Sequence, residues 1–165
     1  MSTDDTRNAP GATGAGMTGT VTVGYDGSAT SSAALRWAAD QAALRGAALQ
    51  IVSCYRIPVA AAGIEAWPAA ESAVALLAVA EQQALAARDM ALVEHPELTV
   101  TTEVSAGPAS AVLVDGAGPG DLIVVGASSH HGAAAFWLGS TPRRVIRHAP
   151  CPVAVVRSEA SRGAA

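Results

Sequence analysis

Residues 121–157 read DLIVVGASSHHGAAAFWLGSTPRRVIRHAPCPVAVVR, and this stretch decides the fold. A continuous apolar run, Leu122–Val125, stops at Gly126, and a loop of small residues and histidines follows. Gly139–Pro142 then opens a helix, and Pro152–Val156 has the pattern of a last strand. Backbone can approach a phosphate where side chains are absent, and the first N–H groups of a helix point at it. The stretch therefore has the parts of an anion site.

Along the rest of the chain, short apolar runs alternate with segments whose apolar residues recur at helical spacing. This pattern predicts that strands and helices alternate. Strands connected through helices pair in parallel by right-handed crossovers. We expect an α/β fold: one open, doubly wound, five-stranded parallel sheet of order 3-2-1-4-5 with helices on both faces. The predicted strands are 20–25, 49–55, 98–105, 121–125 and 152–156, and the predicted helices are about 30–46, 71–94, 108–117 and 141–148.

Two of these helices carry an apolar side that we expect to face the sheet. In the helix 30–46 it consists of Leu35, Ala38, Ala39 and Ala42, and in the helix 71–94 of Val74, Leu77, Ala78, Leu85 and Leu92.

The folded domain is expected over 19–157. Residues 1–18 and 158–165 lack a hydrophobic period and are expected to be disordered tails.

Composition excludes several classes of function. The 165 residues carry a net charge of −4, which argues against nucleic acid as a partner. All ten basic residues are arginines, so lysine-dependent chemistry is excluded. No run is long enough to span a membrane and no secretory signal is evident, so we expect a cytoplasmic protein. The two cysteines, Cys54 and Cys151, are expected to be free thiols in apolar strands.

The predicted order places the most distinctive loops together. The first strand ends at Asp26-Gly27-Ser28 and the fourth at Gly126. Strands one and four are neighbours at the point where the order reverses, and ligands of open α/β sheets bind there. Asp26 is thus a ligand candidate, although an aspartate before glycine is also a common turn residue.

Five motifs, in this order and spacing, resemble the universal stress protein family. They are VTVGYDGS at 21–28, VSAGPA at 104–109, DLIVVG at 121–126, LGS at 138–140 and HAPCPVAVV at 148–156. The resemblance covers about 19–157 and implies an ATP-binding protein that acts in stress response as a ligand-biased regulator, with Mg²⁺ accompanying the nucleotide.

The resemblance also implies roles for individual residues. ATP-binding members carry a motif similar to G-x2-G-x9-G-[S/T], and here Ser129 replaces the middle glycine. Asp26 would contact the nucleoside and Cys54 would flank the adenine, with Gly27 and Ser28 in the turn beside them. The phosphates would be held at the loop and helix start, by Gly126, Ser129, Gly139, Ser140 and Thr141. Ser140 could instead serve only as a helix cap.

Other readings stay open. Because Ser129 departs from the motif, one alternative is a stress protein that binds no nucleotide and acts as a dimeric interaction module. A third hypothesis is a flavin or nucleotide-dependent enzyme on the same fold. The sequence shows no general base, nucleophile or metal cluster, so ATP hydrolysis would at most be slow. His130 and His131 lack a third ligand at helpful spacing, and we interpret them as loop surface.

A homodimer is expected through the last strand. Pro152–Val156 is short, apolar and uncharged, and the predicted order puts it at a sheet edge. Such an edge offers unpaired N–H and C=O groups to a second copy. Dimers through this strand are also what the resemblance implies.

Overall fold

The computed structural model describes residues 19–56, 67–127 and 138–158. Within them lies one parallel five-stranded sheet of order β3-β2-β1-β4-β5. The predicted fold class and strand order are therefore confirmed. The elements in chain order are β1 (Val21–Gly24), α1 (Ala29–Arg45), β2 (Leu49–Tyr55), α2 (Trp67–Glu94), β3 (Val100–Ala106), α3 (Ala109–Asp115), β4 (Leu122–Gly126), α4 (Ser140–His148) and β5 (Val153–Val156).

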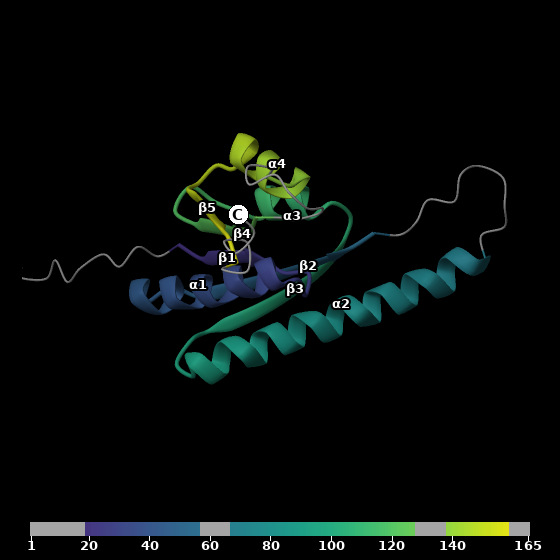
Figure 1. Cartoon of the computed structure of the whole chain (residues 1–165), viewed down its shortest axis with the longest axis horizontal. Coiled ribbons are helices and arrows are strands. Elements are labelled where there is room, and N and C mark those ends of the chain that lie inside the picture. The colour runs from purple at the N-terminus through teal and green to yellow at the C-terminus, as the bar shows by residue number, and fades with distance from the viewer. Residues whose placement is uncertain (1–18, 57–66, 128–137, 159–165) are drawn as a thin grey trace, which may run out of the picture.

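The helices cover the two faces of the sheet in pairs (Figure 1). Successive side chains of a strand point to opposite faces, so each central strand contributes to two cores. On the α1/α2 face the buried side chains include Val21, Val23, Ile51 and Val124. On the α3/α4 face they are Val52, Leu113, Ile123, Val125 and Val145. This burial on both sides explains why Leu122–Val125 is apolar without interruption.

Helix α1 follows the sequence pattern closely. The side chains expected on its inner side are all buried, and the side chain of Ser28 accepts a hydrogen bond from Ser31 N as the N-cap. Trp37 packs partly buried against the same core.

Helix α2 corrects two expectations. It begins at Trp67 instead of about 71, because Pro68 falls in the first turn, where a missing N–H breaks no helical bond. Its inner side was also wrongly predicted, since Val74, Ala78 and Leu85 are exposed. The side chains of α2 that are buried against the domain belong to alanines, which let the helix lie close to the sheet and to α1: Ala80, Ala84, Ala87 and Ala91.

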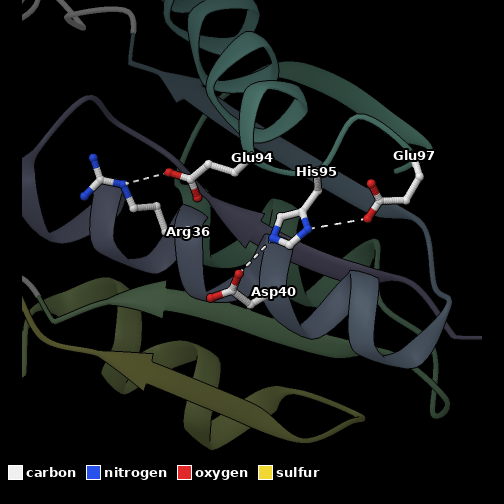
Figure 2. Close-up of polar contacts among 5 residues, drawn as sticks. All are labelled: Arg36, Asp40, Glu94, His95 and Glu97. Carbon is white, nitrogen blue, oxygen red and sulfur yellow. Dashed lines mark hydrogen bonds and ion pairs between the residues drawn. The ribbon is translucent and has the colours of Figure 1, made fainter.

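Polar contacts join the end of α2 to α1 (Figure 2). His95 Nε2 lies 2.8 Å from Asp40 Oδ1, and its Nδ1 lies 3.5 Å from Glu97 Oε1. The hydrogen bond with Asp40 is the largest cause and raises the pKa of His95. Desolvation is the next largest and lowers the pKa, and the negative charges of Asp40 and Glu97 raise it, so the pKa lies above its ordinary value. The cationic form of His95 therefore favours this helix contact.

The proposed tails, apart from Ser158, lie outside the described residues, as does the loop segment 128–137 with Ser129, His130 and His131. Among the helices that the structure describes, none is both long enough and apolar enough to cross a membrane.

Candidate functional site

A cavity of about 150 Å³ opens at the carboxyl ends of β1, β2 and β4. The first turns of α1 and α4 and one side of α3 close it, so six elements meet there. The lining residues are Gly24, Tyr25, Asp26, Ser28, Thr30, Ser31, Val52, Cys54, Ala109, Leu113, Val125, Gly126, Thr141 and Pro142. The cavity lies where the strand order reverses, between β1 and β4.

A tight turn presents Asp26 at the mouth of this cavity. Asp26 Oδ1 accepts a hydrogen bond of 3.0 Å from Ser28 N. Gly27 between them has φ of 79°, a left-handed conformation that favours glycine. The turn is thus fixed by its own sequence, and it leaves the Asp26 carboxylate exposed.

The Asp26 carboxyl is held in its charged form. Partial desolvation acts to raise its pKa, but hydrogen bonds from Ser28 and Ser31 together outweigh that effect, and the pKa lies below its ordinary value. At neutral pH the cavity therefore has a negative acceptor at its mouth. Such an acceptor suits hydroxyl or amino groups of a ligand and repels a phosphate placed directly against it.

Hydroxyl groups at the start of α1 form a connected network behind Asp26. Ser28 Oγ lies 3.1 Å from Thr30 Oγ1 and 3.2 Å from Ser31 Oγ, and Ser31 Oγ donates to Ser28 O at 3.0 Å. Thr30 and Ser31 are buried. Because each hydroxyl has partners in the network, this wall of the cavity is ordered before any ligand arrives.

Gly126 brings the end of β4 against the backbone of α1. A Cβ at this position would lie 2.8 Å from both the carbonyl carbon and the oxygen of Thr30, and 3.0 Å from Ser31 N. These are backbone atoms that cannot move aside cheaply. Glycine is therefore required here for packing, independently of any contact with a ligand.

Cys54 at the end of β2 forms the opposite wall. Its side chain is half-buried, and its sulfur is in no disulfide. Burial first, and then the charge of Glu103, raise the pKa of this thiol. Cys54 thus stays a neutral thiol at physiological pH and contributes a soft, weakly polar surface.

The start of α4 faces two ways. Gly139 is the N-cap and offers no side-chain cap, and Thr141 and Pro142 turn into the cavity. Ser140 is exposed and lines a separate open hollow on the outer side of α4, together with Arg143 and Arg144. The alternative in which Ser140 serves only as the helix cap is wrong, because Gly139 is the N-cap and Ser140 is the first residue of the helix.

The structure brings five of the nine sequence-predicted site residues to one cavity: Asp26, Ser28, Cys54, Gly126 and Thr141. Gly27 lies in the same turn but faces Gln83 of α2, whose Nε2 would be 3.1 Å from an added Cβ. Gly139 and Ser140 adjoin the cavity without lining it, and Ser129 lies outside the described residues.

Sequence reasoning missed Thr30, Ser31 and Leu113 as lining residues. The hydroxyl-rich run at 28–32 was a usable signal, since it follows Asp26 directly. No local signal marks Leu113, which reaches the cavity only through the packing of α3 on the sheet. Among the residues that the structure describes, no group of His, Cys, Asp and Glu could hold a metal ion.

Comparisons with known proteins show which family this chain resembles. The model of the universal stress protein family matches residues 17–157. A universal stress protein of Mycolicibacterium smegmatis is 32% identical over 146 residues, which are 84% of this chain and 48% of that protein. The chain spans about half the length of the curated relatives it matches.

Two solved structures share the fold over nearly their whole length. Universal stress protein UspA from Lactobacillus plantarum has a TM-score of 0.71 and 26% identity, and the match covers 84% of this chain and 97% of that one. A universal stress protein in complex with cAMP has a TM-score of 0.55 and 28% identity, with 86% and 98% covered.

Proposed function

The chain belongs to the universal stress protein family, and from that membership we propose that it binds an adenine nucleotide in the cavity beside Asp26. The cavity itself carries the proposal, because it gathers three strand ends and two helix starts where the strand order reverses. The similar structure in complex with cAMP supports the ligand class.

The nucleoside would occupy the side of the cavity formed by β1 and β2. There the ionised Asp26 would accept hydrogen bonds from ribose hydroxyls, beside Gly27 and Ser28. The thiol of Cys54 and the side chains of Val52 and Leu113 offer a mostly apolar surface for the base. This division follows from charge, because among the described lining residues the only carboxylate belongs to Asp26.

The phosphates would lie on the other side, between Gly126 and the first turn of α4. Gly126 exposes backbone there, and Gly139, Ser140 and Thr141 start a helix whose first N–H groups have no helical acceptors. We place Ser129 near the same phosphates from the sequence motif alone. Mg²⁺ would arrive bound to the phosphates and keep much of its own water.

ATP is the nucleotide we propose, and it would be only partly enclosed. The cavity volume of about 150 Å³ is smaller than the roughly 300–1,000 Å³ of sites that bury drug-sized ligands. A triphosphate would therefore extend from the cavity over the start of α4. We propose a cytoplasmic regulator whose nucleotide biases conformation or partner choice, with no catalytic residue assigned.

Calorimetric titration with ATP and Mg²⁺ at millimolar ligand tests this function. Asp26→Asn keeps the side-chain shape and removes the charge. We expect it to weaken binding about tenfold or more, since a hydrogen bond to a charged group contributes about 1.5–3 kcal/mol. Asp115→Asn, an exposed change at the end of α3, is the matched control and should bind like wild type. Absence of heat in wild type would reject the proposal and favour the interaction module.

We also propose the homodimer through β5, which the interaction module requires. In the described structure β5 pairs with β4 on one side only and lies at the edge of the sheet. Its ladder uses Pro152 O and Val156 O. Bonds of a parallel pair alternate along the strand, so the N–H and C=O groups of Val153 and Val155 point to the open edge.

Substitution of proline at that edge tests the dimer. Val155→Pro removes an N–H that the β4 ladder does not use, and edge strands tolerate such a proline. We expect a lower average mass by light scattering after size exclusion, because the β5 contact is lost, with nucleotide binding retained. A wild type that is monomeric at about 50 μM would contradict this dimer, because stable interfaces of ordinary size are populated at such concentrations.

A further inference from the structure

Helix α2 carries an exposed apolar face that neither the cavity nor β5 explains. Its four large members are Val93, Val74, Leu85 and Val79, with 83%, 69%, 51% and 50% of their surface exposed. Scattered surface hydrophobics are ordinary, but a group on one face marks an interaction site. We call this face the outer stripe of α2, and its exposed members are Val74, Ala75, Ala78, Val79, Gln82, Leu85, Ala86, Asp89 and Val93.

The outer stripe lies opposite the side of α2 that packs on the domain. At about 100° per residue its members fall within an arc of roughly 140°, and the buried alanines fall on the far side. The helix has 28 residues, about 42 Å at 1.5 Å per residue. In Figure 1 its N-terminal end extends beyond the sheet, so the stripe is presented on a helix that runs along the outside of the domain.

The stripe repeats at the spacing of a heptad. Ala78 and Leu85 are seven residues apart, and the half-buried Leu92 beside the stripe continues that row. Ala75, Gln82 and Asp89 also recur every seven residues, three places before each of them. Two such rows form the seam by which one helix packs against another. Small side chains at 75 and 78 would allow close approach, and Leu85 near the middle of the exposed length would supply the central contact.

The charged residues beside the stripe favour a second copy of this chain as its binding partner. Glu81 and Arg88 are seven residues apart, exposed, and lie on the same edge of the seam. When two copies of one helix pack antiparallel, the same edge of each copy meets across the two-fold axis. In the register that sets Gln82 against the partner subunit's Leu85, Glu81 meets the partner subunit's Arg88 and Arg88 meets the partner subunit's Glu81.

The two polar members of the seam fit the same register. Gln82 and the partner subunit's Asp89 then fall in neighbouring layers, where an amide can donate to a carboxylate. Polar groups in such a seam fix register at a cost in stability. The opposite edge is apolar on both copies, since Val79 would meet the partner subunit's Ala86. A parallel pair would instead set the Glu81 and Arg88 edge of each copy against the apolar edge of the other, where the two charges meet no opposite charge.

We propose that the outer stripe of α2 is a self-association surface that pairs antiparallel with α2 of a second copy of this chain. The contact is isologous, so it occurs twice by symmetry and closes on itself. It is separate from β5 and from the nucleotide cavity. A chain with both interfaces assembles beyond a dimer, and a chain with the α2 interface alone forms a dimer.

Charge reversal tests the proposal through sedimentation velocity of the full chain at about 50 μM, where a stable interface is populated. Glu81→Arg and Arg88→Glu each place like charges together twice, and we expect on the order of tenfold weaker association or more. The average mass should fall, and in a dilution series its fall should begin at about tenfold higher concentration than in wild type. The double variant restores opposite charges and should regain the wild-type mass. Asp115→Arg and Arg45→Glu reverse exposed charges elsewhere and should leave the mass unchanged.

Each outcome decides the point, because the substituted side chains are exposed and circular dichroism can check that the variants fold. A monomeric wild type, single variants that keep the wild-type mass, or a double variant that stays dissociated would each overturn the antiparallel pairing. Val155→Pro in the same assay distinguishes the two interfaces, since it removes only the β5 contact. These experiments do not measure nucleotide binding, so the proposed self-association and the proposed nucleotide binding are tested independently.

Discussion

Replacing Gly126 by alanine tests the packing on which the cavity depends. The added Cβ would lie 2.8 Å from the Thr30 carbonyl carbon and oxygen and 3.0 Å from Ser31 N. Those atoms belong to the first turn of α1 and cannot rotate away, so the end of β4 or the start of α1 must shift. Overpacking of this kind costs about 1–3 kcal/mol.

Urea and thermal unfolding measure that cost. For a chain of this size 1 kcal/mol corresponds to roughly 2–4 °C, so Tm should fall by about 2–12 °C. Gly118→Ala is the matched control, because its Cβ would meet only Asp121 Oδ2 at an ordinary 3.5 Å. We expect it to unfold within about 0.5 kcal/mol of wild type, as unstrained surface changes do.

The displaced wall should also weaken ATP binding, since Gly126, Thr30 and Ser31 all line the cavity. A Gly126→Ala protein as stable as the Gly118→Ala control would refute the close approach of β4 to α1. A protein that loses stability but binds ATP unchanged would refute the link between this packing and the ligand.

Three further predictions concern stability. Ser28→Ala removes the N-cap of α1 and should cost about 1 kcal/mol in urea unfolding; an unchanged midpoint would show that the hydroxyl network compensates. Leu113→Ala truncates a buried side chain and should lower the free energy of unfolding by about 2–5 kcal/mol. A smaller decrease would mean that α3 moves into the space left behind. Because Asp40 raises the pKa of His95, the stabilising effect of that contact is complete below the ordinary pKa of 6.5 and is lost as pH rises through the higher folded value. Tm of wild type should therefore fall above about pH 6.5 more than Tm of His95→Gln does, and parallel pH profiles would contradict it.

Much of the fold was predictable because local and long-range signals agree. The apolar runs of the strands, the serine before α1 and the stripe Leu35–Ala42 each favour the same element that the sheet requires. Chirality of the crossovers then leaves few strand orders, and the strand order was predicted correctly. The turn Asp26-Gly27-Ser28 was predictable for the same reason, since its geometry is fixed within three residues.

Helix α2 shows where such reasoning stops. Periodicity identified a helix, but it could not tell which of two apolar sides faces the sheet. The larger side chains suggested the inner side, whereas close packing on β2, β3 and α1 selected the alanines. Leu113 was missed for a related reason, because its place in the cavity depends on how α3 crosses the sheet. Side chains of this kind are placed by tertiary packing, which a local pattern does not encode.

Amide chemical shifts of the full chain during titration with ATP and Mg²⁺ test the central claim most directly. The account predicts that the largest changes fall at Asp26–Ser31, Cys54, Gly126 and Thr141, which come from four separate segments and meet only at the cavity. Amides of the outer stripe of α2 should stay unchanged. No shifts at millimolar ATP, or shifts confined to the outer side of α4 around Arg143 and Arg147, would contradict nucleotide binding in this cavity.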